Sequence, residues 1–162
     1  MIDKIDRNIL KILQENGRTP NAEIARKVGL APSAVFERLR KLEAAGIILG
    51  YTVRLNPKAL KLGMMAFVFV RTDERVGATI AAEELAKLPE VLELYNVAGE
   101  DCYLLKLRAE SPEDFARVLR EKFGPIPKIQ STRSTIVLMT LKESCNLPLP
   151  PAQKSDRARE EK

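Results

Sequence analysis

The chain has 162 residues, of which 45% are hydrophobic and 30% are charged, and its formal net charge is +5. This length allows two small domains, each with an apolar core of its own. Because the longest apolar run covers only residues 64–70 and the first residues are polar, we expect neither a membrane-spanning helix nor a secretory signal. Cys102 and Cys145 lack the spacing of a metal site or a redox pair, so we expect reduced thiols in a cytoplasmic protein.

The positive charge is confined to the first part of the chain. Residues 1–63 carry 12 Lys and Arg against 6 Asp and Glu, whereas residues 64–162 carry 15 against 16. A net charge of +5 on the whole chain would be weak support for any partner, but a basic first part is what a phosphate-contacting module requires. The distribution therefore favours nucleic acid as the partner of residues 1–63.

Residues 3–14 have the apolar periodicity of a helix. Asp3 and Asp6 lie near the positive end of its dipole, and Asn16-Gly17 ends it. Its apolar face would carry Ile5, Ile9, Ile12 and Leu13. A third helix of this kind gives two short amphipathic helices further along the chain the core that they need.

Residues 21–42 have the spacing of a helix-turn-helix. The two helices have apolar stripes formed by Ile24, Ala25 and Val28 and by Val35, Leu39 and Leu42. Gly29 between them can adopt the positive φ that the turn needs, and Leu30 anchors the turn. Pro20 and Pro32 are predicted at the first position of each helix, with Thr19 as the cap of the first. Ala31 cannot cap the second, so its amides stay free for a phosphate unless Ser33 takes that role.

The outer face of the second helix predicts a DNA recognition surface. We expect the DNA-contacting residues to be Ser33, Phe36, Glu37, Arg38, Arg40 and Lys41. A solvated helix in a small bundle is the alternative interpretation of this face. Phe36 suits contact with a thymine methyl group or packing against a neighbouring domain. Arg38 lies beside the buried stripe, so it contacts DNA or braces the domain.

An extended connector follows the recognition helix. Gly46 ends that helix, residues 47–55 are extended, and Asn56-Pro57 forms a turn. We place a domain boundary near residues 61–63 and predict four parts: a DNA-binding domain over 1–49, a hinge over 50–63, a second domain over 64–143 and a disordered tail over 144–162.

The second domain alternates strands and helices in a ferredoxin-like order. Strands are predicted over 64–70, 91–97, 103–107 and 131–141, and helices over 78–88 and 111–123, with Ser111 as a cap. The fold class is therefore α+β, with a βαββαβ domain after a winged-helix-like helix-turn-helix domain. Residues 66–70 and 136–141 are apolar at consecutive positions, although two helices can cover only one face of the sheet. A second subunit should cover the other face, and a homodimer would present two recognition helices to a pseudo-palindromic duplex site.

Catalysis has little support in this composition. The chain has no histidine, no glycine-rich phosphate loop and no nucleophile elbow. We therefore expect no enzymatic activity, no cofactor and no metal site.

Several motifs resemble those of the Lrp/AsnC, or feast/famine, family of regulators. The resemblance is carried by residues 2–10, 16–18, 23–25, 28–30, 38–43 and 46–51, and it extends over residues 2–143. It implies an N-terminal DNA-binding domain, a hinge strand and a C-terminal effector-binding and oligomerisation domain, called the RAM domain. It also implies a transcription regulator whose dimers assemble into tetramers or octamers and respond to an amino acid or a related small molecule.

The family's effector loop resembles residues 97–103. We expect Gly99 to expose its backbone to the ligand, and Glu100 and Asp101 to supply negative charge for an ammonium group. Family members often carry Asp at the position of Cys102 in this chain. Three polar residues that alternate at the start of the last strand would complete the site: Gln130, Thr132 and Ser134. An ordinary hairpin turn and a solvated strand are the alternative interpretation.

Two other functions fit the same pair of domains. A tetrapyrrole decarboxylase-like enzyme would need a histidine near its substrate, which this chain cannot supply. An amino-acid sensor that lacks DNA binding is the second alternative, and the basic helix at residues 32–42 argues against it. Binding to duplex DNA separates both from a sequence-specific DNA-binding regulator.

Overall fold

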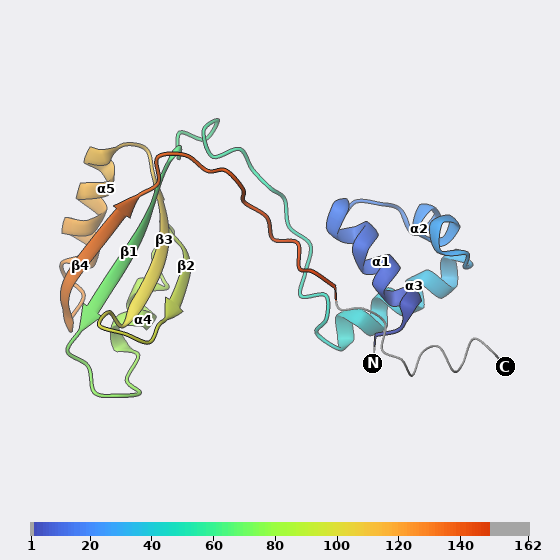
Figure 1. The fold of residues 1–162 in the computed structure, drawn as a ribbon, viewed down its shortest axis with the longest axis horizontal. Helices are drawn as coiled ribbons and strands as arrows, with labels where there is room; N and C mark the ends of the chain where they lie inside the picture. The colour runs from blue at the N-terminus through green and yellow to red at the C-terminus, as the bar shows by residue number, and fades with distance from the viewer. Residues whose placement is uncertain (1, 150–162) are drawn as a thin grey trace. The chain divides into compact units, whose positions relative to one another are not determined.

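The computed structural model describes residues 2–149, which divide into two compact units (Figure 1). The helical unit contains the chain up to Arg54 together with residues 143–149, and the sheet unit contains Leu55–Lys142. The division between Arg54 and Leu55 falls inside the predicted hinge of residues 50–63. The chain therefore passes from one unit to the other twice.

The helical unit has three helices in the predicted order: α1 over Lys4–Glu15, α2 over Asn21–Val28 and α3 over Pro32–Ala44. The α1 helix begins with a capping box, in which the Asp6 amide donates to Asp3 Oδ1 at 2.7 Å and the Asp3 amide donates to Asp6 Oδ2 at 3.2 Å. This reciprocal bonding fixes both carboxylates at the start of α1.

A small apolar core joins the three helices as the sequence predicts. Its buried members are Ile9, Ile24, Ala25, Val35 and Leu39. Gly29 ends α2 with φ of +73°, and the Leu30 amide donates to the Ala25 carbonyl at 3.0 Å. The helix-turn-helix is thus confirmed, turn included.

The prediction that Thr19 caps α2 was wrong. Pro20 occupies the N-cap position, and the helix begins one residue later at Asn21. The Thr19 hydroxyl instead donates to the Asn16 carbonyl at 2.8 Å, which ties it to the turn after α1. Ala31 and Pro32 lie at the N-cap and N1 of α3 as predicted, and no side chain caps that helix, so Ser33 does not take the role.

An extended segment follows α3. Gly46 has φ of +65°, and the Ile47 amide returns to the Leu42 carbonyl at 2.9 Å, which ends the helix. The chain then runs without a strand partner until turns around residues 57–61. Residues 143–149 also belong to this unit, because the Gln14 side-chain amide exchanges two hydrogen bonds with the backbone of Leu147, at 3.1 and 2.6 Å. The rest of the predicted tail lies outside the described residues.

The sheet unit has the predicted βαββαβ order. Its strands are β1 over Met64–Thr72, β2 over Val91–Asn96, β3 over Tyr103–Ala109 and β4 over Ile129–Ile136, paired antiparallel in the order β2-β3-β1-β4. Its helices are α4 over Ile80–Leu85 and α5 over Pro112–Val118, which continues as a π-helical turn over Leu119–Phe123. The ferredoxin-like arrangement is confirmed.

One face of the sheet is packed against α4 and α5. The alternate residues Val68, Val70, Leu105 and Leu107 are fully buried there, together with Leu85 and Phe123 from the helical layer. On the other face, Phe67, Phe69 and Leu104 are only half-buried, with Lys106 and Arg108 beside them. We call this second surface the open face of the sheet, because no helix of the described chain covers it.

The last strand is shorter than the predicted 131–141. It begins at Ile129 and ends at Ile136, and the Val137 amide makes a final bond to the Met65 carbonyl at 2.9 Å. Because β1 begins at Met64, residues beyond 137 have no strand beside them. Leu138, Met139 and Leu141 are consequently exposed. The β4 strand therefore does not extend the apolar run of residues 138–141 along β1.

Candidate nucleic-acid interface and ligand-binding loop

The outer face of α3 is exposed as predicted. Ser33, Glu37, Arg40 and Lys41 all lie on it, and Phe36 is 56% exposed despite its size. Arg40 Nη2 lies 3.3 Å from Glu37 Oε2, in an exposed pair one helical turn apart. Exposed pairs of this kind are weak, so a phosphate can replace Glu37 as the partner of Arg40. The first amides of α3 also lack a side-chain cap, which leaves donors at its positive end.

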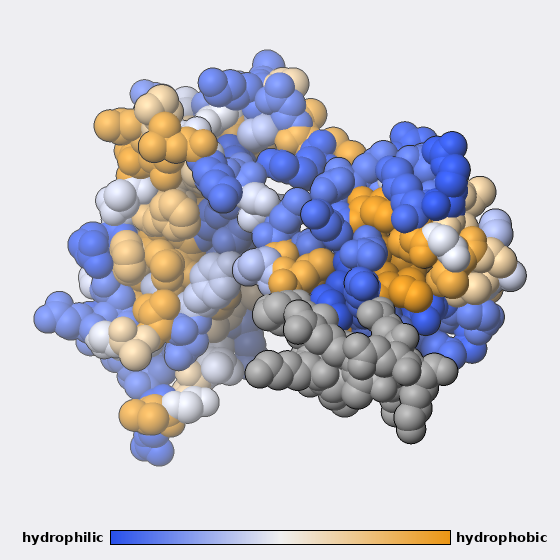
Figure 2. All heavy atoms as spheres, turned by 45° about the vertical axis from the view of Figure 1, so that its right-hand side comes forward, coloured by the Kyte–Doolittle hydropathy of each residue, from blue (hydrophilic) through white to orange (hydrophobic). Residues whose placement is uncertain are grey.

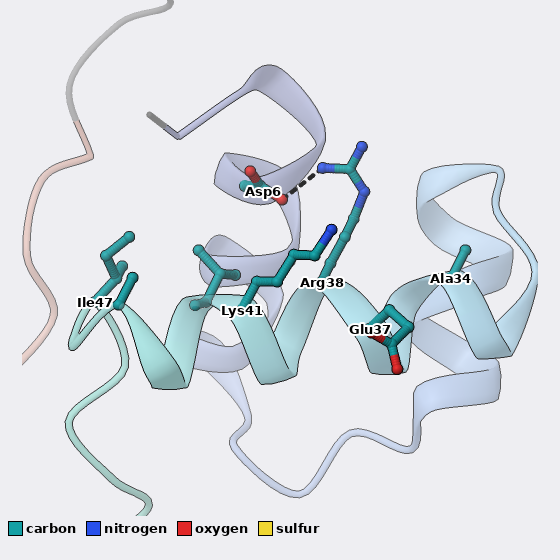
Figure 3. A pocket seen from close by; sticks show the side chains of 8 residues that line it. Asp6, Ala34, Glu37, Arg38, Lys41 and Ile47 are labelled. Carbon is teal, nitrogen blue, oxygen red and sulfur yellow. Dashed lines mark hydrogen bonds and ion pairs between the residues drawn. The ribbon is translucent and has the colours of Figure 1, made fainter.

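Arg38 lies on a different side of α3 from Arg40. Its Nη1 atom is 2.6 Å from Asp3 Oδ2 and 2.7 Å from Asp6 Oδ1, the two carboxylates of the α1 capping box. Figure 3 shows the pair that Arg38 makes with Asp6. The Arg38 side chain is 30% exposed, so the interaction is only partly screened by water. The sequence left two roles open for Arg38, a contact to DNA and a brace within the domain. This geometry supports the second, in which Arg38 braces α3 against α1.

The brace affects the ionisation of its members. Burial alone would raise the pKa of the Asp3 carboxyl, but hydrogen bonds from the Asp6 amide and Arg38 hold that pKa below its ordinary value. The same two carboxylates raise the pKa of the Arg38 guanidinium. Asp3 and Arg38 therefore both stay charged at neutral pH.

A shallow hollow of about 510 Å³ adjoins the brace. It is lined by Asp6, Ala34, Glu37, Arg38, Lys41, Leu42, Ala45 and Ile47. Figure 3 shows Arg38 and Lys41 rising from the same side of α3, whereas Glu37 points away from them. Lys41 thus lies at the border between the outer face and the hollow.

The loop between β2 and β3 contains the predicted ligand-binding residues. The Val97 amide donates to the Cys102 carbonyl at 3.0 Å, and the Cys102 amide donates to the Val70 carbonyl at 2.9 Å. Between them Gly99 has φ of +143°, a conformation that side chains other than glycine rarely adopt. The loop is therefore closed on itself and joined to β1.

Two arginines hold this loop from the sheet. Arg71 Nε donates to the Glu100 carbonyl at 3.1 Å, and Arg133 Nη2 lies 2.8 Å from Asp101 Oδ2. The Arg133 guanidinium carbon also lies 4.1 Å from the ring centroid of Phe69, within the range of a cation–π contact. No role was predicted from the sequence for either arginine. The available signal was the presence of basic residues on strands of a domain whose β2–β3 loop carries Glu100 and Asp101.

The structure does not bring Thr132 and Ser134 to this loop. They lie directly opposite Val70 and Val68, so their side chains are on the helix-covered face of the sheet, whereas Arg133, opposite Phe69, is on the open face. Gln130 lies at the irregularity where the pairing of β1 and β4 shifts. Thr132 and Ser134 do share one face of β4, as predicted. The residue that reaches the loop is Arg133, which lies between them and faces the other way.

Cys102 faces away from the loop surface. Its thiol lies 3.9 Å from the Thr72 carbonyl, and the side chain packs against the core of the sheet unit. Asp101, which comes one residue before the position where family members often carry Asp, pairs instead with Arg133. No group of His, Cys, Asp and Glu in residues 2–149 has the arrangement of a metal site.

Comparison with known proteins assigns both parts of the chain. Residues 2–48 match a winged helix-turn-helix DNA-binding domain, and residues 65–147 match the Lrp/AsnC ligand binding domain. The chain belongs to the Lrp/AsnC family. The resemblance carried by the sequence motifs is thus confirmed, and so is a DNA-binding transcription regulator as the kind of protein.

Relatives of this Lrp/AsnC protein span nearly its whole length. It is 38% identical over 148 residues to the HTH-type transcriptional regulator FL11 of Pyrococcus horikoshii, covering 91% of this chain and 97% of that protein. It is 37% identical over 150 residues to the leucine-responsive regulatory protein of Escherichia coli K12, covering 90% of each. Both relatives are transcription regulators by name.

Solved structures of related regulators share the fold. A Neisseria meningitidis transcriptional regulator in complex with L-Met is 36% identical, with a TM-score of 0.83 over 91% of this chain and 97% of that one. Escherichia coli AsnC is 32% identical, with a TM-score of 0.85 over 91% and 99%. A feast or famine regulatory protein of M. tuberculosis complexed with L-methionine is 33% identical, with a TM-score of 0.84 over 91% and 99%.

Within residues 2–149 of this chain, no helix is long and apolar enough to cross a membrane.

The brace predicts a pH-dependent loss of stability. Replacing Arg38 with Ala should lower the free energy of unfolding of the helical unit by about 1 kcal/mol at pH 7, a few degrees in Tm. Because the folded-state pKa of Asp3 is depressed, this stabilisation is present above the unfolded pKa of about 4 and is lost as pH falls through the folded value. The difference in Tm between wild type and Arg38→Ala should therefore shrink below about pH 4. Thermal melts from pH 3 to 7 measure it.

Arg40→Ala is the matched control, because Arg40 lies on the same helix and, within residues 2–149, its ion pair is with exposed Glu37. Its Tm should stay close to that of the wild type across this pH range. Equal Tm losses in the two variants would remove the bracing role of Arg38.

Proposed function

We propose that this protein is a sequence-specific transcription regulator that reads duplex DNA with α3 and responds to an amino acid held at the loop over residues 97–102. The observation that carries the DNA-binding part is the exposed outer face of α3, on a helix whose opposite stripe is buried against α1 and α2. The proposal assigns residues 1–49 to DNA binding, 50–63 to the hinge and 64–143 to ligand binding and assembly. It gives the chain no catalytic role and places it in the cytoplasm.

The α3 helix would enter the major groove. In this arrangement Arg40 and Lys41 contact phosphates or base edges, and Phe36 provides an apolar contact. Ser33 and Glu37 lie on the same exposed face and would approach base edges. Arg38 would act from the side, by fixing α3 against α1 rather than by contacting DNA.

The salt dependence of binding tests this assignment. Each phosphate contact that is lost removes about one unit from the slope of log K against log salt, so Arg40→Ala/Lys41→Ala should flatten the slope by about two units and lower affinity. Titration of an operator duplex at several salt concentrations measures the slope. Lys87→Ala/Arg120→Ala removes the same charge from the sheet unit and should leave the slope unchanged. An unchanged slope in the α3 variant would place the contacts elsewhere.

A second copy of the chain is the proposed partner for two apolar surfaces. One is the open face of the sheet. The other is the segment after α3, where Ile47, Leu49, Tyr51, Val53 and Leu55 alternate with other residues and are exposed, Leu49 at 93%. Figure 2 shows apolar side chains, in orange, reaching the surface of the sheet unit on the left. Burying such surfaces against a copy related by a twofold axis would pair two α3 helices for a pseudo-palindromic site, and dimers would assemble further into tetramers or octamers.

A charge on the open face tests the dimer. Phe67→Lys places an ammonium group in the middle of this face, so sedimentation velocity should show a shift towards the monomer. The variant should also lose the preference for paired half-sites about 34–36 Å apart over a single half-site. Val76→Lys makes the same change at a fully exposed loop position and should sediment as wild type. A Phe67→Lys protein that remains dimeric would exclude the open face as the interface.

An amino acid is the proposed effector. The loop offers a carboxylate at Asp101 for an ammonium group and exposed backbone at Gly99, and related regulators have been solved with L-methionine. Glu100 adds a second negative charge beside them. Thr132 and Ser134, on the other face of the sheet, are left out of this site.

A branched side chain at Gly99 tests the loop. In the wild type, saturating L-methionine or L-leucine should raise Tm by a few degrees, as linkage requires at concentrations about 100 times Kd. Gly99→Val forces the backbone out of its φ of +143° and should abolish the shift, while DNA binding without effector stays near the wild-type value. Gly77→Val strains a positive φ in another loop of the same unit and should keep the shift. A shift that persists in Gly99→Val would place the effector elsewhere.

A further inference from the structure

Arg133 joins the ligand-binding loop to the open face of the sheet. Its Nη2 atom lies 2.8 Å from Asp101 Oδ2, and its guanidinium carbon lies over the ring of Phe69, 4.1 Å from the ring centroid. Asp101 belongs to the loop, whereas Phe69 belongs to the middle of the open face. The Arg133 side chain therefore contacts both the loop proposed to bind the effector and the face proposed to bind a second copy.

The two contacts differ in how readily they can be exchanged. The Arg133 side chain is 63% exposed, and the Asp101 side chain is 23% exposed. An ion pair with one well-solvated member adds little net stability, so a second cation can compete for the carboxylate. The loop itself would stay in place, because Arg71 and the Cys102 amide hold its backbone independently of the Arg133 pair.

The Arg133–Asp101 pair also matches the charges of a zwitterion. An ammonium group that takes Asp101 leaves the guanidinium without its carboxylate, and the carboxylate of the same ligand molecule can replace it. Guanidinium and carboxylate form strong, directional hydrogen bonds. Inserting an amino acid would thus leave every charge at the site paired, whereas an amine without a carboxylate would leave Arg133 unpaired.

We propose that Arg133 is the internal counter-ion that an amino acid displaces from Asp101, and that the ligand's carboxylate then draws the guanidinium off Phe69, which changes the open face and hence the assembly. This inference rests on the proposed function, because it assumes that the effector binds at the loop. It adds a carboxylate anchor and a route from ligand to interface. It requires both charged groups on the α-carbon of the ligand and leaves the side chain free to set specificity.

Calorimetric titration of the full chain tests whether Arg133 competes for Asp101 and anchors the ligand's carboxylate. The probes are L-methionine and L-leucine, each paired with the amine that lacks its carboxylate, 3-(methylthio)propylamine and 3-methylbutylamine. For wild type we expect binding of the amino acids and about tenfold weaker binding of the amines. Arg133→Gln should bind the amino acids about tenfold more weakly but the amines more tightly than wild type, because Asp101 has lost its competitor.

Two variants guard against a merely structural effect. Arg133→Lys retains a cation and should restore most of the amino-acid affinity, whereas Arg120→Gln makes the same substitution as Arg133→Gln on the helix-covered side and should match wild type. If Arg133→Gln binds both classes of probe as wild type does, or loses affinity for both equally, the anchor role is overturned while the proposed effector function stands. If wild type binds none of the probes, the proposed effector function fails and this inference fails with it.

Sedimentation velocity tests the route to the interface. Saturating amino acid should change the assembly of wild type. Phe69→Leu keeps an apolar residue but removes the ring on which Arg133 rests, so it should still bind the amino acid but show no ligand-dependent change in assembly. A Phe69→Leu protein that still responds, or a wild type that binds without responding, would overturn the coupling.

Discussion

The β1 strand is apolar on both faces, while the described chain covers only one of them. On the covered side, Val68 and Val70 are fully buried under α4 and α5. On the other side, Phe67 and Phe69 are left half-buried among charged residues. Burial of apolar area is the main favourable term in folding and association, so the covered face stabilises the sheet unit and the open face offers apolar area that the proposed second copy would bury. The loop over residues 97–102, the candidate ligand site, lies at the end of the same strand and is joined to it through Val70 and Arg71.

The loop over residues 97–102 and the open face therefore share β1. Under the proposed coupling, a change at the loop would reach the open face through Arg133 and Phe69, which lie opposite each other on β4 and β1. In the helical unit, two basic residues of α3 have different environments. Arg38 pairs with α1 and fixes the position of α3, whereas Arg40, two residues further on, is exposed to solvent. Neighbouring basic residues on one helix therefore have opposite environments, because helical periodicity turns them to different sides.

Local patterns predicted most of the fold. The three helices and the turn at Gly29 follow from apolar spacing and from the conformational freedom of glycine, both of which act over a few residues. Thr19 was misassigned because the Asn16 carbonyl competes for its hydroxyl, a contact within the preceding turn that a cap motif does not encode. The end of β4 could not be predicted from its own residues, since it depends on where β1 begins.

The candidate site was harder to predict because it depends on register. A one-residue shift in pairing moves a side chain to the opposite face of a sheet, and β4 carries a pairing irregularity near Gln130. Thr132 and Ser134 look suitable by composition, but it is Arg133 that faces the loop. Its partner Asp101 lies 32 positions away along the chain, so no local pattern connects them.

The double passage of the chain between the two units has an entropic consequence. The return segment is bonded to α1 through Gln14 and Leu147, and Arg54 donates to the Glu143 carbonyl at 3.1 Å. These contacts close the chain between Arg54 and Glu143 into a single loop that contains the whole sheet unit. The entropy lost in closing a loop grows with the length of its flexible part, and a folded sheet unit shortens that part. Folding of the sheet unit therefore favours the contacts that bind the return segment to the helices.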